Sequence, residues 1–119
     1  MSREVVLLCP RQMPTDAGAF QPEDCVPFGR TKEVRGRVDA VVPGIEWSTK
    51  SAGSLSATDC ALEIHLHLPG DAGPEVMQIM LSFSAGSAEE SVLAIIRKLS
   101  AGLSAVALDA ADGELVHLG

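Results

Sequence analysis

Residues in the middle of the chain alternate between apolar and polar side chains, the pattern of strands that bury one face. In residues 60–68 every second residue is apolar. Residues 76–83 repeat the alternation, with Val76 on the outward face and the Pro- and Gly-rich residues 69–74 between the two runs. The pattern predicts an antiparallel β-hairpin.

Two other segments repeat apolar residues every three or four positions, as amphipathic helices do. Four valines between Val34 and Val42 share one helical face, and Thr31 stands where a cap is expected. The second segment has a broader apolar stripe, and Ser87 and Glu90 before it have the spacing of a capping box. We expect one helix from Thr31 to the Pro-Gly pair after Val42, and another from Ser87.

Short apolar segments at both ends complete the predicted fold. Residues 5–8 and 105–108 are predicted strands, and a tight turn leads to a short edge strand at residues 115–118, while residues 10–30 are irregular. With one weak strand before the hairpin, the order is β-α-β-β-β-α-β-β. This order predicts a single α+β domain over residues 1–119, with a largely antiparallel sheet, two helices packed on one face and ferredoxin-like character.

Composition supports a folded chain without a membrane span. The chain has 119 residues, of which 46% are hydrophobic, and the mean hydropathy is +0.22. No stretch approaches the roughly 20 apolar residues that cross a bilayer. The first apolar run is too short for a secretory signal. We therefore expect a soluble cytoplasmic protein.

Charge is distributed unevenly between the two halves of the chain. The net charge is −7, yet residues 1–50 balance seven basic against seven acidic residues. Residues 51–119 hold nine acids and only two cations, Arg97 and Lys98. A nucleic acid or an anionic membrane would be repelled by this field, so a charged partner is expected to be a basic protein. Alternatively, the acidity serves solubility alone.

Motifs for covalent catalysis or phosphate binding are missing from the sequence. No Ser lies in a Gly-x-Ser-x-Gly elbow, and no Gly-rich loop is followed by Lys and a helix. Cys9, Cys25 and Cys60 are odd in number and unpaired in spacing, which indicates reduced structural thiols, Cys60 in the core. We expect no cofactor and no enzymatic activity.

A metal site is the alternative that the hairpin suggests. Glu63, His65 and His67 alternate along one strand face, so two imidazoles and a carboxylate point the same way. His117 or Asp109 would add a ligand if the closing strands pair beside this one. The simpler interpretation is that these polar residues fill the solvent face of an amphipathic strand.

Partner-binding candidates come from the single tryptophan and the acidic residues. Trp47 follows a Pro-Gly stop, where a tryptophan either plugs the end of a helix or anchors a partner at the surface. Glu63, Glu75 and Glu89 are the carboxylates expected to attract a basic partner. Because strand 76–83 is apolar on both faces, a homodimer is also compatible with the pattern.

Two short motifs resemble a group of small uncharacterised bacterial proteins. In that group a helix runs into Pro-Gly-Ile-Asp-Trp-Ser, and the chain closes on Asp-x-x-x-Gly-Glu; here the motifs run from Pro43 to Ser48 and from Asp109 to Glu114. The likeness covers residues 34–47 and 75–114. The group tends to have Trp-Gly where this chain has Ala52-Gly53, and a tryptophan where it has Ala105. The resemblance implies an α+β fold and a toxin-immunity or adaptor role.

Taken together, these patterns favour a small acidic protein-binding module, of immunity or adaptor type. The alternative is a metal-binding domain or metal-dependent enzyme built on Glu63, His65 and His67.

Overall fold

The computed structural model describes residues 3–10, 25–57, 59–67 and 75–110, and these residues form an α+β fold. Two helices and a mostly antiparallel sheet confirm the predicted fold class. The elements, in chain order, are β1 (Arg3–Leu8), β2 (Gly29–Arg30), α1 (Thr31–Val41), β3 (Glu46–Trp47), β4 (Ala52–Ser56), β5 (Ala61–His67), β6 (Glu75–Val76), β7 (Gln78–Phe83), α2 (Glu89–Leu103) and β8 (Val106–Asp109).

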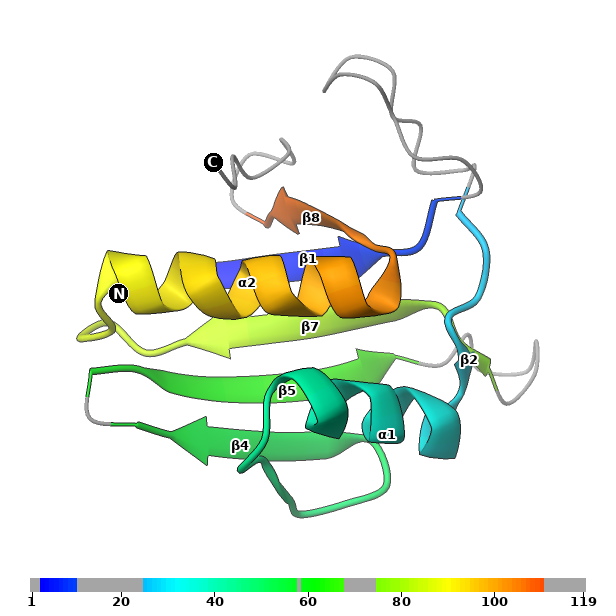
Figure 1. Cartoon of the computed structure of the whole chain (residues 1–119), viewed down its shortest axis with the longest axis horizontal. Helices are drawn as coiled ribbons and strands as arrows, with labels where there is room; N and C mark the ends of the chain where they lie inside the picture. The colour runs from blue at the N-terminus through cyan, green and yellow to red at the C-terminus, as the bar shows by residue number, and fades with distance from the viewer. Residues whose placement is uncertain (1–2, 11–24, 58, 68–74, 111–119) are drawn as a thin grey trace.

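Six strands form the main sheet in the order β3-β4-β5-β7-β1-β8, and every neighbouring pair is antiparallel. The four strands β5-β7-β1-β8 and the two helices follow the ferredoxin-like order, in which the first strand lies between the last two. The hairpin of β3 and β4, inserted after α1, extends this sheet at one edge (Figure 1).

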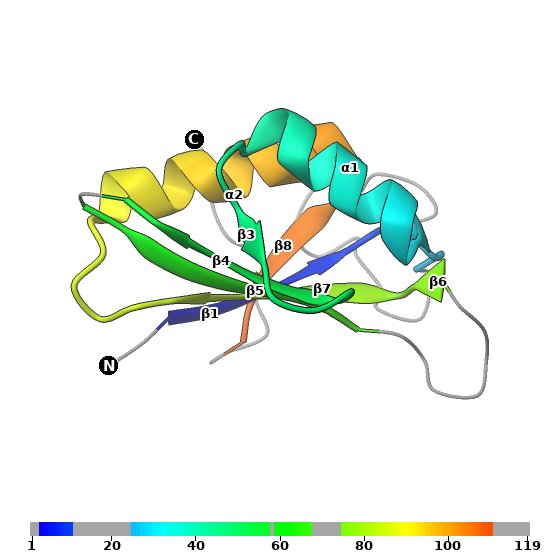
Figure 2. The ribbon, with the colours of Figure 1, turned by 90° about the horizontal axis from the view of Figure 1, so that it is seen from below.

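Both helices lie on one face of the sheet, as Figure 2 shows in a side view. Alternate residues of the central strands point into this layer: β5 and β7 have the burial pattern expected of a half-buried strand, with Ile64, Ile79 and Leu81 fully buried. The apolar stripe of α2 closes the core from above, and a single cluster of buried side chains includes residues of both helices. The sheet therefore has a buried helix face and an opposite face that no described helix covers, here called the open face.

The predicted run 76–83 is divided in the structure. Met77 interrupts the ladder, with its N–H donating to the carbonyl of His67, so Val76 belongs to β6 and pairs with Gly29 of β2. The predicted outward orientation of Val76 is wrong, because the interruption changes the side-chain parity and Val76 is fully buried.

Both predicted helix caps are also wrong. Thr31 is already the first residue of α1, and the cap position, Arg30, makes no side-chain hydrogen bond. The cap position of α2 is Ala88. The hydroxyl of Ser87 accepts instead from the N–H of Ala61, 3.2 Å away, and so connects the start of this helix region to β5.

The irregular stretch 10–30 is described only at its ends. Pro10 forms an isolated bridge with Cys25, and Gly29–Arg30 form β2. The predicted turn at 111–113 and the predicted strand at 115–118 lie outside the described residues. Within the described part of the chain, neither helix is long and apolar enough to cross a membrane.

Candidate functional site

The open face carries a straight row of acidic and hydroxyl side chains across five strands. Directly paired positions place these residues side by side, and they are here called the acidic row: Glu46, Ser54, Glu63, Ser82 and Glu4, from β3 to β1. Its three carboxylates are exposed. No Lys or Arg occupies this face in the described strands, so the row presents a negative surface to solvent.

An apolar strip lies next to the acidic row, toward the β8 edge of the sheet. Its side chains come from β1, β7 and β8, and register pairs them across the strands: Val6, Leu8, Met80, Val106 and Leu108. Val106 is buried and the other four are half-buried, and none of the five belongs to the core cluster. The open face therefore combines apolar contact area with charge, as protein interfaces do.

A hollow of about 430 Å³ opens where the acidic row crosses β4, β5 and β7. Its polar lining consists of Glu63 and the hydroxyls of Ser54, Ser56, Ser82 and Ser84. Of these residues only Glu63 was a sequence-based candidate. The serines come from β4, from β7 and from the residue that follows β7, and only the pairing of both strands with β5 brings them together, so no local pattern in the sequence could have identified the hollow.

The three acidic candidates do not form one surface. Glu63 lies on the open face, with 71% of its side chain exposed. Glu75 lies on β6, which pairs with β2 outside the main sheet. Glu89 begins α2, and its carboxylate accepts a hydrogen bond of 2.6 Å from Arg3, so its charge is partly neutralised on the helix side. Of the three, the structure places only Glu63 in the acidic row.

The histidines share the open face with Glu63, as the alternation predicted. The Nε2 atom of His65 lies 3.9 Å from a carboxylate oxygen of Glu63, and His67 follows two residues later on β5. No group of three or more ligand-type side chains in the described residues is placed to hold a metal ion.

Asp109, one of the two further ligands suggested for this metal site, does not lie beside it. Asp109 lies on β8, which is separated from β5 by β7 and β1. Its position is paired with Val5, on the helix face, and its carboxylate lies 3.8 Å from Arg3. The condition under which Asp109 would add a ligand, that its strand pairs beside β5, is therefore not met, and His117 lies outside the described residues.

Trp47 lies between the β3–β4 hairpin and α1, on the helix side of the sheet. Its indole N–H donates to Asp39 at 3.0 Å, and the guanidinium of Arg35 stacks 4.8 Å from the ring centre. A Cβ atom on the paired residue Gly53 would lie 3.0 Å from the indole, so the ring rests directly on that backbone. This placement is that of a plug that joins a helix to the sheet.

Two cysteines have the environment of structural thiols. Cys60 is buried in the core, as the alternation predicted. Cys9 is half-buried and packs against the core; burial raises the pKa of its thiol, and the positive charge of Arg37 opposes that shift in part. A raised pKa keeps the Cys9 thiol protonated and unreactive at neutral pH.

Comparison of the chain with family models, with curated proteins and with solved structures finds no match.

Proposed function

We propose that this protein is a binding module that docks a basic protein partner on the open face of its sheet. The observation that carries the proposal is the hollow lined by Glu63 and serine hydroxyls in the middle of the acidic row. A Lys or Arg side chain has the donors that such a lining accepts, and arginine anchors that fill pockets dominate many interfaces.

Charge supports a basic partner. The acidic row contributes three carboxylates, and the chain as a whole carries −7. Such a field attracts and orients a cationic surface during encounter. The apolar strip beside the row supplies area for the desolvated part of an interface. A toxin-immunity or adaptor role, which the resemblance to small bacterial proteins implies, requires this kind of surface.

A second copy of the chain fits this face less well. Two open faces placed against each other would bring together two sets of carboxylates without a Lys or Arg from either described sheet. Like charges across an interface are unfavourable. A homodimer on this face is therefore kept as an outcome of the test.

The test compares two charge reversals. Glu63→Lys changes the hollow, and Glu90→Lys changes another exposed carboxylate at the start of α2, away from the open face. The wild type and each variant are immobilised and incubated with a lysate of the cells from which the protein comes. A protein that the wild type retains is purified and titrated by calorimetry at about 50 and 200 mM salt.

We expect a basic protein whose affinity falls with salt, drops at least about tenfold for Glu63→Lys and changes less than about twofold for Glu90→Lys. The proposal would be contradicted if the wild type retained no protein, if both variants lost affinity equally, or if the affinity did not depend on salt. Light scattering of the purified protein tests the other occupant: a dimer that Glu63→Lys alone dissociates would replace the basic partner with a second copy.

A further inference from the structure

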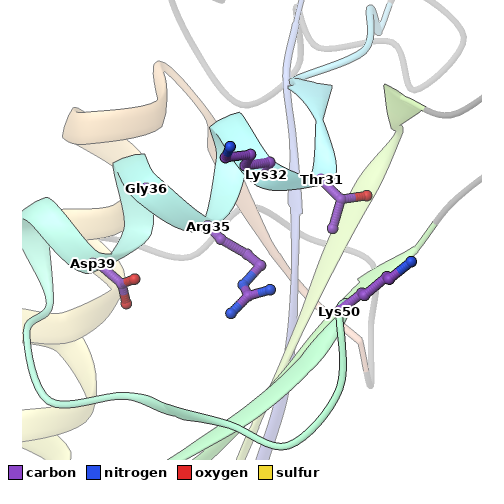
Figure 3. Close-up of a pocket in the computed structure, with 6 residues that line it drawn as sticks. All are labelled: Thr31, Lys32, Arg35, Gly36, Asp39 and Lys50. Carbon is purple, nitrogen blue, oxygen red and sulfur yellow. The ribbon is translucent and has the colours of Figure 1, made fainter.

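A second pocket, of about 550 Å³, lies on the other side of the molecule, between α1 and the loop that leads into β4. Its lining comes from one face of the helix and from that loop: Thr31, Lys32, Arg35, Gly36, Asp39 and Lys50. Figure 3 shows Thr31, Arg35 and Asp39 projecting from α1 toward the loop, with Lys50 at the start of the opposite wall. The volume is within the range of small-molecule sites.

Positive charge is concentrated in this pocket although the protein is acidic. Lys32, Arg35 and Lys50 line it, and no carboxylate of the described part of the chain forms an ion pair with any of them. Asp39 is the one acid in the lining, and it accepts the hydrogen bond of the Trp47 indole. Three cations and one carboxylate leave a local charge of about +2 that a bound anion would neutralise.

The walls that carry these charges are fixed. The Trp47 ring supports the Arg35 guanidinium from below, at 4.8 Å. On the other wall, the N–H groups of Ser48 and Thr49 both donate to the carbonyl of Ala52, and the N–H of Ser51 donates to the Thr49 hydroxyl, so the backbone around Lys50 is held. A pocket wall that is held in place before binding loses less entropy on binding.

Gly36 keeps the pocket open. It lies inside α1, where glycine costs about 1 kcal/mol relative to alanine, and a Cβ atom built on it would meet nothing within 4 Å. Neither a close contact nor a positive φ requires glycine here. The absent side chain leaves room between Lys32 and Asp39, and a larger residue would occupy the pocket.

We infer that this pocket binds the phosphate group of a small phosphorylated molecule. A phosphate monoester carries up to two negative charges near neutral pH, which match the local charge, and its oxygens accept from both Lys and Arg. A long polyanion fits less well, because the rest of the surface is acidic and repels it. The inference does not depend on the basic partner proposed for the open face.

The test uses pyrophosphate and ribose 5-phosphate as probes, with ribose and with sodium chloride of matched ionic strength as controls. Trp47 is the only tryptophan, and it contacts Arg35, so its fluorescence reports occupancy; calorimetry gives an independent affinity. The variants are Lys32→Gln, Lys50→Gln and Gly36→Gln. Lys98→Gln, on an exposed position of α2 outside the pocket, removes the same charge as a control.

We expect saturable binding of at least one phosphate probe, with a dissociation constant below about 1 mM. Each lysine variant in the pocket should weaken it about fivefold, and Lys98→Gln less than twofold. Gly36→Gln should weaken it as much without lowering the thermal midpoint. The inference would be overturned if the phosphate probes and sodium chloride changed the fluorescence equally, or if Lys98→Gln and Lys50→Gln lowered the affinity equally. Unchanged affinity in Gly36→Gln would also overturn it.

Discussion

The two helices cover the same face of the sheet but contribute to the protein differently. The longer α2 buries a stripe of side chains along its whole length, from Val92 through Ile96 and Leu99 to Leu103. The shorter α1 fully buries only Val34 and Val38 and directs charged residues outward. The comparison indicates that α2 supplies most of the helical part of the core, while α1 contributes less to the core and more to the pocket beside it.

A glycine inside each helix sharpens this difference. At Gly102, a Cβ atom would lie 2.6 Å from a methyl group of Val41, because the C-terminal ends of the two helices approach closely there. Arg37 reinforces the approach by donating to the carbonyl of Gly102 at 3.2 Å. At Gly36 the same atom would meet nothing. One glycine is required by packing, and the other leaves a space.

Truncation of a core residue in each helix tests the comparison most strongly. Ile96 and Val38 are both fully buried. Ile96→Ala should lower the free energy of unfolding by about 3 kcal/mol, through lost burial and a cavity. Val38→Ala, which removes fewer atoms, should lower it by about 1.5 kcal/mol. Denaturant titration measures both. A larger loss for Val38→Ala would mean that α1, and not α2, is the main helical support of the core.

Gly102→Ala should have the next largest effect. The new methyl group requires Val41 or the helix backbone to shift, at a cost of about 1–3 kcal/mol that exceeds the gain in helix propensity. Val41→Ala removes the obstructing methyl groups. In that background, the further change Gly102→Ala should therefore lower the free energy of unfolding much less than it does in the wild type. Additive losses in this double-mutant cycle would show that the two ends do not contact as described.

Gly36→Ala should have the smallest effect and the opposite sign. Because the site is open and helical, alanine should raise the free energy of unfolding by about 0.5–1 kcal/mol, which thermal denaturation detects as a higher midpoint. A lower midpoint would show that Gly36 is needed for the fold and that its role is not to keep the pocket open.

The periodicity of apolar residues along the sequence correctly predicted the central strand and the longer helix. The alternating residues 60–67 contain strand β5, and the segment with the broad apolar stripe forms helix α2. The errors arise where tertiary contacts compete with local signals: Ser87 bonds to β5 instead of capping α2, and the interruption at Met77 buries Val76. These outcomes depend on which strands are neighbours, which a single sequence does not encode locally.

The candidate sites divide in the same way. Glu63 and Trp47 were identifiable as a carboxylate on an exposed strand face and as a lone aromatic residue. The residues that surround them could not be identified from the sequence. Ser82 lies beside Glu63 only because β5 pairs with β7. Arg35 and Asp39 contact Trp47 only because the chain reverses at Gly44. Glu89 lies outside the acidic row, and its carboxylate is paired with Arg3, a residue far away in sequence.

The position of β1 has a consequence for how the chain is made. β1 is synthesised before the other described strands, and both strands that pair with it, β7 and β8, follow much later in the chain. Until those strands emerge, the apolar residues of β1 have no strand to pair with. We therefore expect the sheet to close only after β8 has left the ribosome, and a deletion that removes β1 to separate β8 from the rest of the sheet.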